Sequence, residues 1–364
     1  MKMGIGKTFA LTCLVLGLGS HALEAATAKP LRKVTYLFSL RTLPSHTAPL
    51  VSVPKVMGYW EAEGLDVEVA AAGGSMQAAQ MLVAGNADFF NGGVGSFLVI
   101  QAQSSGAVVA VGNSFKGNMY YPAVPAESDI TDLKGLKGKR IGVPAAGTGG
   151  TPLIKAVARS LGMDPEKDIS ITSVGYGAQA ATALRNKSVD ALSFWLQQYL
   201  IIENLGMKLR PLKDSPLFQH MTFELPYAFR RDDLEKRPEV VIGALRGIAK
   251  GLVFSAANPE AAIRIHWDLY KSKPPGLQEA DALRSELRVL NGVMPYYLPD
   301  PKRWGEMGRE EVEAEQNFVF DAGLLKQKLD PSTIYTNKFI DEINRFDRKE
   351  IEEQARRFKG PGAR

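Results

Sequence analysis

The amino-acid sequence predicts an α/β protein made of two similar lobes. Three observations lead to this fold class: an ordinary globular composition, strand patterns that alternate with helix patterns, and an internal repeat. The 364 residues are 45% hydrophobic, 23% charged and 9% aromatic, which excludes disorder or fibrous structure as the main architecture. A chain of this length is expected to form about two domains.

Charge and cysteine content argue against nucleic-acid-binding, disulfide-rich and cysteine-zinc proteins. The chain has 44 Lys and Arg residues and 39 Asp and Glu residues, and the net charge of +5 is spread along it without a basic block ahead of the C-terminal tail. This distribution argues against nucleic-acid binding. The single cysteine, Cys13, can form neither a disulfide framework nor a cysteine zinc cluster.

Residues 1–28 are predicted to be a secretory signal peptide. Lys2 and Lys7 form a positive start before an apolar run at 9–19, and a small-residue cleavage site follows at 26–28. The alternative, an apolar core helix, would need a packing partner that nothing upstream supplies, and the run is too short to span a bilayer comfortably. Because no later segment reaches roughly 18 uncharged apolar residues, the mature protein is expected to be soluble and exported.

The mature chain begins with strand patterns that alternate with helix patterns, as is typical of a parallel sheet. The predicted order is a strand, a loop rich in Pro, Ser and Thr, a helix, a strand with period-2 alternation, and a helix that follows a glycine turn. These elements lie, in order, at 34–39, 40–49, 51–60, 65–69 and 76–84.

The strand–helix–strand pattern recurs later in the chain, and this repeat is the most informative feature of the sequence. Chance could place alanines and one aspartate in any two α/β segments, but a shared offset across a strand, a helix and a following strand favours two related halves. The matched residues, at identical spacing, are Val67, Val69, Ala78, Ala79, Leu82 and Asp88 with Ile169, Ile171, Ala180, Ala181, Leu184 and Asp190.

The last third of the chain is predicted to be mainly helical. A strand at 221–229 comes first, and helices follow at 238–256 and 258–270. Asn258 and Pro259 supply a cap and a first-turn proline for the second of these helices. The charged end, 347–364, is expected to form a solvated helix and a frayed tail.

Catalytic signatures are missing from the sequence, which contains no P-loop, no nucleophile elbow and no H-E-x-x-H helix. The turn at 147–151 approaches a dinucleotide fingerprint, but Pro152 occupies the third glycine's position and no acidic residue closes the next strand. No cofactor and no metal are therefore expected. His46, His220 and His266 are interpreted as surface or satisfied core histidines.

Three small-residue turns, at 73–75, 92–96 and 147–151, are candidate anion sites. Helix N-termini present unpaired N–H groups and a dipole that favours negative charge. Such turns are common in α/β proteins, so one alone is weak evidence. Three of them in repeated halves indicate two lobes that face a common cleft, because ligands of open α/β sheets bind beyond the carboxyl ends of the strands.

Several stretches resemble the periplasmic substrate-binding components of ABC importers for nitrate, sulfonates, taurine and related molecules, a group that includes the thiamine-pyrimidine-synthase-like proteins. Together these stretches span nearly the whole mature chain. They lie at 58–67, 82–88, 132–143, 189–195, 321–324 and 335–339.

This resemblance implies a type II periplasmic-binding-protein fold, with two α/β lobes joined by two crossing strands and a ligand cleft between them. Lobe one would comprise 29–122 and 229–346, lobe two 123–228, and 347–364 a charged tail. The implied function is capture of a small ligand and closure of the hinge, after which an ABC importer permease recognises the closed form. The loop at 39–54 looks longer than the corresponding loop of the family. The family's ligand contacts from this loop therefore cannot be assigned to residues of this chain.

Two other functions stay open at this point. The fold also hosts pyrimidine synthases and menaquinone-pathway enzymes, although the synthases carry a cysteine-rich iron motif that a mature chain without cysteine lacks. An export signal also argues against cytosolic biosynthesis. A periplasmic ligand sensor would bind its ligand in the same way, but a signalling receptor would recognise the closed form in place of a permease.

The ligand is expected to be a small organic anion, such as a sulfonate or carboxylate, bound by a monomer. Arg41 is a candidate for two parallel hydrogen bonds to the acid group, and the alternative is a solvated loop arginine. Phe90, Tyr176, Phe194 and Trp195 either stack on a planar ligand or pack in the core. The predicted ligand-binding residues are Ser39, Arg41, Gly74, Ser75, Gly93, Ser96, Gly147, Thr148, Gly149, Thr151, Tyr176, Trp195 and Tyr227.

Overall fold

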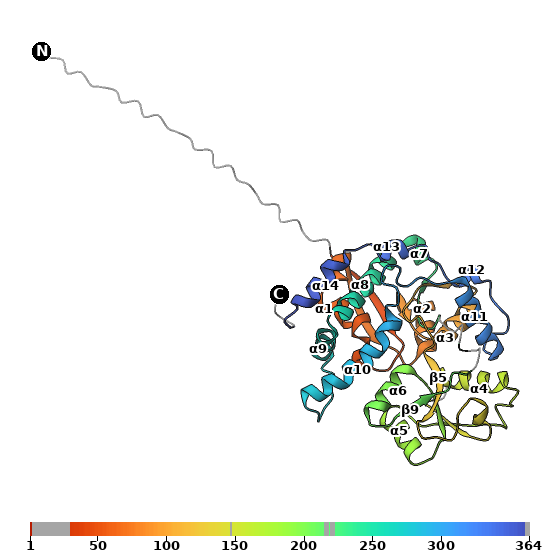
Figure 1. Ribbon diagram of the computed structural model, residues 1–364. Helices are drawn as coiled ribbons and strands as arrows, with labels where there is room; N and C mark the ends of the chain where they lie inside the picture. Colours follow the sequence, from red (N-terminus) through yellow and green to blue (C-terminus); the bar gives the residue numbers. More distant parts are fainter. Residues whose placement is uncertain (2–29, 146–147, 215–217, 219–222, 361–364) are drawn as a thin grey trace. The chain divides into compact units, whose positions relative to one another are not determined.

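The computed structural model describes residue 1 and residues 30–145, 148–214, 218 and 223–360. The predicted signal peptide, apart from Met1, lies outside the described residues. The chain divides into Met1–Pro30 and a compact unit, Leu31–Arg364, which contains both predicted lobes (Figure 1).

Two five-stranded mixed sheets form the framework of the compact unit, and they share one topology. The strand orders are β2-β1-β3-β10-β4 and β7-β6-β8-β5-β9. In each sheet the fourth strand runs antiparallel to its neighbours. The strands of lobe one are β1 (Arg32–Phe38), β2 (Leu65–Ala71), β3 (Phe89–Asn91), β4 (Val108–Asn113) and β10 (Pro226–Arg230), and those of lobe two are β5 (Tyr120–Pro125), β6 (Arg140–Val143), β7 (Ser170–Ser173), β8 (Ala191–Trp195) and β9 (Leu209–Pro211).

The chain crosses between the two sheets twice. The first crossing lies between β4 and β5 and the second between β9 and β10, so each antiparallel fourth strand directly follows a crossing. This arrangement confirms the predicted fold class of two α/β lobes. The residue boundaries of the lobes stay a prediction.

Helices cover both faces of the lobe-one sheet, and the lobe-two helices gather around the second sheet (Figure 1). Two apolar clusters, one on each face of the lobe-one sheet, hold its helices, and a third forms the core of lobe two. The helices are η1 (Ser45–Leu50), α1 (Ser52–Val56), η2 (Glu61–Glu63), α2 (Ser75–Val83), α3 (Val94–Gln103), η3 (Lys134–Leu136), α4 (Gly150–Ser160), α5 (Ala178–Arg185), α6 (Leu196–Asn204), α7 (Asp233–Lys236), α8 (Pro238–Ala257), α9 (Pro259–Tyr270), α10 (Glu279–Tyr297), α11 (Arg309–Asp321), α12 (Pro331–Ile334), α13 (Ile340–Ile343) and α14 (Arg348–Arg357).

The internal repeat is confirmed at the level of single hydrogen bonds. The Asp88 carboxylate accepts from the backbone N–H of Thr35 at 2.8 Å, and Asp190 accepts from the N–H of Arg140 at 2.8 Å. The backbone N–H of each aspartate in turn donates to the carbonyl of that same partner. Each aspartate therefore ties the strand after the repeated helix, β3 or β8, to the neighbouring strand β1 or β6.

We expect Asp88→Ala to cost about 3 kcal/mol of unfolding free energy and Asp190→Ala about 1 kcal/mol. The Asp88 side chain is only 18% exposed and also pairs with Arg237 at 2.8 Å, whereas Asp190 pairs with Arg140, which is 47% exposed. Denaturant unfolding of both variants checks the difference. Equal losses would show that burial does not set the contributions of the two aspartates apart.

The structure corrects two sequence-based expectations. The helix expected at 51–60 is the short α1, which ends ahead of Gly58, a residue in the left-handed region at φ +70°. The charged end is not merely solvated, because α14 buries Ile351 and Ala355 against the α8–α9 region. The last residues of the tail, 361–364, lie outside the described part.

Within the described residues, one helix passes a test for a membrane span by length and composition alone. This is α8, with a mean hydropathy of 1.6, although charged residues interrupt it and it is not an uncharged run of about 18 residues. Its apolar window is 72% buried inside the protein, which makes it weak evidence for a span. Its Arg246 and Lys250 both pair with Glu63, at 2.8 and 2.9 Å. These features fit a core helix.

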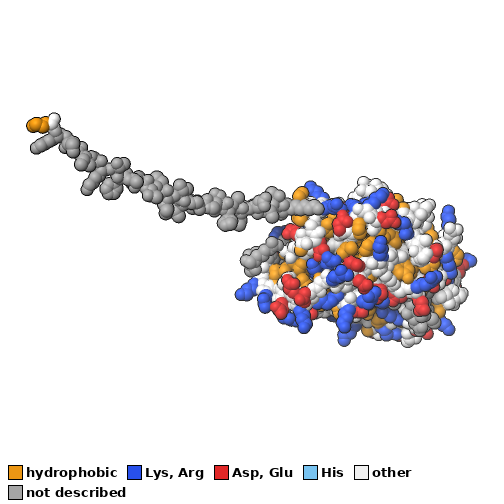
Figure 2. Space-filling view, turned by 90° about the horizontal axis from the view of Figure 1, so that it is seen from above, with side chains coloured by type: hydrophobic (Ala, Val, Ile, Leu, Met, Phe, Trp, Pro, Cys, Tyr) orange, Lys and Arg blue, Asp and Glu red, His pale blue; other side chains and the backbone are white. Residues whose placement is uncertain are grey.

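Surface charges of both signs are mixed. On the face that Figure 2 shows, Lys and Arg side chains alternate with Asp and Glu side chains without a large area of one sign. This view agrees with the interspersed charges of the sequence.

Candidate functional site

Ser39, Ser75 and the Gly92–Gly93 turn meet at the carboxyl ends of the lobe-one parallel strands. Ser39 follows β1, Ser75 begins α2, and the two glycines follow β3. The Gly93 N–H donates to Ser75 Oγ at 2.9 Å, and a Cβ on Gly92 would lie 2.9 Å from Ser39 Oγ. A side chain at position 92 would therefore displace Ser39. The structure brings together predicted site residues from three strand ends.

The N-terminal turns of α2 and α3 complete this edge. Gly74 is the N-cap of α2 at φ +149°, a conformation that favours glycine. Ser96 lies half-buried in the first turn of α3. At the start of the same helix, the Val94 N–H donates to the backbone carbonyl of Glu224 at 3.0 Å. The N-terminus of α3 is thus tied directly to the second crossing.

The start of α4 forms the corresponding edge of lobe two. Ser193 Oγ, from β8, donates to the Gly150 carbonyl at 2.8 Å, and a Cβ on Gly149 would lie 2.7 Å from Tyr120 Cζ. Thr148 is half-buried, and its hydroxyl donates to the Ala145 carbonyl at 2.9 Å. Gly147 lies outside the described residues.

Thr151 faces a different surface. Its side chain lines a pocket of about 570 Å³ beside β7, together with Ser170 and Ile171. Its hydroxyl is buried and has no hydrogen-bond partner among the described residues. A ligand contact by Thr151 stays a prediction.

Three aromatic rings follow one another at the lobe-two edge. The Trp195 ring, at the end of β8, lies edge-to-face with Tyr120 at 5.7 Å and with Tyr176 at 6.0 Å between centroids. Trp195 is 8% exposed and packs into the lobe-one cluster, whereas Tyr176 is 47% exposed. Phe90 and Phe194 are fully buried, so the core interpretation holds for them. Tyr176 keeps a ring surface that a planar solute can cover.

The remaining predicted residues differ in exposure. Tyr227 is fully buried on β10, and its ring centroid lies 6.3 Å from that of Tyr36. Arg41 is exposed and forms no hydrogen bond or ion pair with the described part of the chain. Its guanidinium is therefore available to a solute.

The loop after Arg41 turns into the core. Ser45 and His46 are 3% and 5% exposed within η1. His266 is fully buried, with its ring nitrogens 3.0 Å from Ser52 Oγ and 2.8 Å from the Leu43 carbonyl. Burial lowers the pKa of His46 to about 3 and of His266 to about 4, so both are neutral. These two are core histidines, as expected, and His220 lies outside the described residues.

Buried polar atoms without a protein partner gather where the lobes meet. We call this region the lobe junction and define it by Asn118, Met119 and Tyr120 at the first crossing, Glu224 at the second, Gln197 of α6 and Glu315 of α11. Within the described residues, both amide atoms of Asn118 and one side-chain oxygen each of Gln197, Glu224 and Glu315 lack a hydrogen-bond partner. Such atoms cost free energy unless water or a solute satisfies them.

Two of these groups are carboxyls with strongly shifted titration. Burial raises the pKa of Glu224 to about 8, and a hydrogen bond from the Met119 N–H opposes that shift. Burial and the neighbouring Glu224 raise the pKa of Glu315 well above its usual range. Sequence reasoning missed both residues. The available signal was a single carboxylate inside an apolar run, at 223–229 for Glu224.

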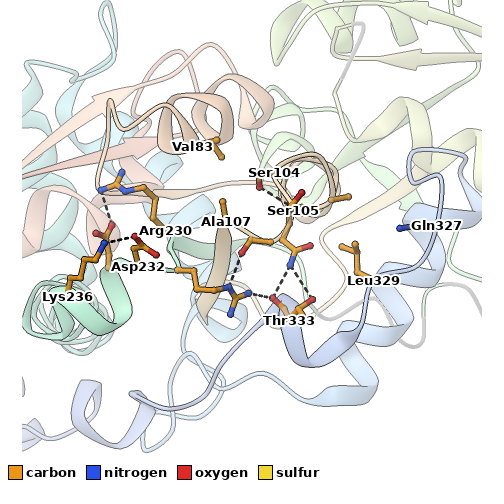
Figure 3. A pocket seen from close by; sticks show the side chains of 15 residues that line it. Val83, Ser104, Ser105, Ala107, Arg230, Asp232, Lys236, Gln327, Leu329 and Thr333 are labelled. Atoms are coloured by element: carbon orange, nitrogen blue, oxygen red, sulfur yellow. Dashed lines mark hydrogen bonds and ion pairs between the residues drawn. The ribbon is translucent and has the colours of Figure 1, made fainter.

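A further pocket lies at the other end of the lobe-one sheet (Figure 3). It measures about 890 Å³, and its lining includes Arg230 at the end of β10 and Ala107 just before β4. Arg231 donates to the carbonyls of Gly106 and Thr333, and Lys236 pairs with Asp232 at 2.6 Å. Because its charged side chains already have partners, this pocket offers little to a charged solute.

A metal centre finds no support in the described residues, since no group of three or more His, Cys, Asp or Glu side chains is placed to hold an ion there. The site is therefore built from serines, glycines, aromatic rings and buried carboxyls. This donor set suits binding through hydrogen bonds and stacking.

Two α/β lobes of matching topology, crossed twice by the chain, define the class of protein: it has the fold of periplasmic binding proteins. A solved structure of the same fold is the periplasmic aliphatic sulphonate binding protein SsuA from Escherichia coli, with a TM-score of 0.64 at 17% identity over 83% of this chain and 96% of that one. The chain belongs to the NMT1/THI5-like family, whose model matches residues 44–262.

Two curated relatives span most of the chain. A Brucella abortus protein named as a binding protein is 27% identical over 289 residues, which are 79% of this chain and 85% of the relative. The 4-amino-5-hydroxymethyl-2-methylpyrimidine phosphate synthase of Legionella pneumophila is 23% identical over 335 residues, 88% of this chain and 96% of the relative.

Proposed function

We propose that this protein is a periplasmic solute-binding protein that captures a small organic anion between its lobes and delivers it to an ABC importer. The observation that carries the proposal is the set of buried, unpartnered polar atoms at the lobe junction. A bound solute would satisfy them. The printed names of the Brucella and Escherichia coli proteins support a binding role.

The acid group of the solute is assigned to the lobe-one edge and Arg41. The N-termini of α2 and α3 converge there beside Ser39 and Ser75. Helix N-termini attract anions, and a free guanidinium adds a charge-assisted hydrogen bond. The exposed ring of Tyr176, on lobe two, would cover the organic part of the solute.

An enzyme is the second candidate, favoured by the similarity to the Legionella synthase. The only cysteine, Cys13, lies in the predicted signal peptide. The cysteine-rich iron motif that the family resemblance implies for the synthases would thus be missing from the mature protein. We therefore place binding ahead of catalysis.

Protein purified from the periplasm is expected to carry a small molecule and to become more compact when it binds one. Native mass spectrometry identifies the copurified molecule. Small-angle scattering of the stripped protein, before and after that molecule is added back, should show a smaller radius of gyration because the lobes close on it. An unchanged profile with the molecule bound would contradict hinge closure, and its conversion to a product would favour the enzyme.

A further inference from the structure

A helix of lobe two lies against a helix of lobe one, beside the crossings (Figure 1). α6 follows β8 and packs on it, whereas α10 packs on η1 and α9 of lobe one. The contact between α6 and α10 joins the lobes at a place other than the two crossings. The contacting residues include Leu200, Glu203 and Asn204 of α6 and Ser285, Arg288 and Gly292 of α10.

The end of this contact nearer the crossings is apolar and tightly packed. A Cβ on Gly292 would lie 2.6 Å from a methyl carbon of Leu200, so the glycine leaves room for the leucine. Leu200 also packs against the lobe-one cluster. Further along α10, the Tyr296 carbonyl accepts from the Lys116 N–H of the first crossing at 2.9 Å, and the Tyr296 ring stacks on Phe115. This end of α10 is therefore fixed to the first crossing.

The other end of the contact is polar and partly exposed. The Asn204 side-chain nitrogen donates to the carbonyl oxygen and to Oγ of Ser285, both at 2.9 Å. Glu203 pairs with Arg288 at 2.7 Å, and their side chains are 26% and 50% exposed. Because water competes for such groups, contacts of this kind form and break at low cost. We call these four residues the polar clasp.

The polar clasp lies well away from the crossings. Ser285 and Tyr296 stand about 16 Å apart along α10, at about 1.5 Å of rise per residue. A rotation of about 15° about an axis through the crossings and across α10 would move the clasp by about 4 Å, which is more than a hydrogen bond tolerates. The apolar end would stay near the axis. The lobes therefore cannot rotate in this way while the clasp stays intact.

Exposure at the two strand edges indicates how the lobes still have to move. Arg41 is exposed at the lobe-one edge, and Tyr176 is 47% exposed at the lobe-two edge. These side chains become enclosed only when the two edges approach each other. The intact clasp therefore belongs to the more open arrangement of the lobes.

We propose that the polar clasp is an interlobe latch, which holds the lobes in the open arrangement and releases when they rotate toward each other. This inference rests on the proposed function, because hinge closure on a solute gives the latch its role. Part of the binding free energy is then needed to open the latch. A protein without the clasp should populate the compact arrangement before any solute is bound.

Spin labels on the two lobes test the latch in stripped protein, without any solute. The only cysteine, Cys13, lies in the predicted signal peptide, so mature protein with Gln80→Cys on α2 and Arg159→Cys on α4 is labelled at these two exposed positions alone. Double electron–electron resonance then measures the distance between the lobes. Adding Asn204→Ala and Arg288→Gln should raise the population of a second, shorter distance about 10-fold.

Arg284→Gln is the matched control for the loss of charge. Arg284 lies on the same helix, and its ion pair with Asp281 at 2.7 Å stays within α10. This variant removes a positive charge without breaking a contact to lobe two, so it should keep the wild-type distance. Circular dichroism should show every variant folded, because the clasp side chains are not part of an apolar core.

The outcomes separate the latch from the proposed function. An unchanged distance in the clasp variant would overturn the latch, and so would a longer distance, which would mean that the clasp resists opening. Both results concern protein without solute and leave solute capture intact. Solute capture fails separately, if protein from the periplasm carries no small molecule. A shorter distance in the clasp variant together with that failure would keep the latch as an interlobe restraint and overturn the proposed function.

Discussion

Gly150→Ala is expected to lower the unfolding free energy by about 3 kcal/mol or more. Gly150 is the first residue of α4, and a Cβ there would overlap the backbone carbonyl oxygen of Ser193 in β8. A backbone atom in the middle of a sheet cannot move aside as the end of a flexible side chain can. Either α4 moves away from β8 or the lobe-two edge is lost. Chemical denaturation followed by circular dichroism measures the loss.

Gly95→Ala is the control for this substitution. Gly95 also lies in the first turn of a helix, α3, but the nearest atom to its Cβ would be 3.9 Å away, in Val319. Alanine favours the helix, so stability should stay the same or rise by up to about 1 kcal/mol. If both variants were equally stable, the close packing of α4 on β8 would have no part in holding the lobe-two edge.

The repeat made the fold predictable because its signal is local. Ala78, Ala79 and Leu82 are fully buried, and so are Ala180 and Ala181 at the matching positions. Spacing along one helix determines which face is buried, and this can be read from the chain without knowing its partners. The strand order could not be derived in this way. It depends on where the chain crosses between sheets. The family resemblance implied two crossings but no strand order.

The local sequence pattern left two features undecided: where α1 ends, and what surrounds the correctly predicted helix α8. The apolar stretch at 51–60 continues past the end of α1, but Gly58 adopts φ +70° and the chain turns there. The apolarity of α8 suits burial under η1, α9 and α14 as well as it suits a membrane, because composition does not distinguish the two surroundings. In both cases tertiary packing decided between structures that the local pattern allowed.

The candidate site was predictable only in part. Turns at strand ends can be recognised from glycine and serine, and Ser39, Ser75 and Gly93 do meet in the fold. Glu224 and Glu315 lie far apart in sequence and acquire their common environment only when α11 packs beside the second crossing. No spacing rule joins such residues. Burial without a partner, the property that makes them notable, exists only in the folded protein.

Arg41→Ala is expected to weaken solute binding by about 2 kcal/mol or more, the range for truncating one partner of a charge pair that becomes buried. Arg41 lies three residues beyond the end of β1, next to Ser39 at the lobe-one edge, and its side chain is exposed and unpaired within the described part. Because the Arg41 guanidinium has no competing partner there, it can pair with the acid group of the solute on closure without breaking another ion pair.

The conservative variant and a distant cation make this prediction specific. Arg41→Lys should recover only part of the affinity, since lysine cannot form the two parallel hydrogen bonds of a guanidinium. Lys33→Ala removes an exposed charge from the opposite end of the same strand and should leave binding unchanged. Calorimetry with the copurified solute decides the question. Wild-type affinity in Arg41→Ala would make Arg41 a solvated loop residue and move the acid group wholly to the N-termini of α2 and α3.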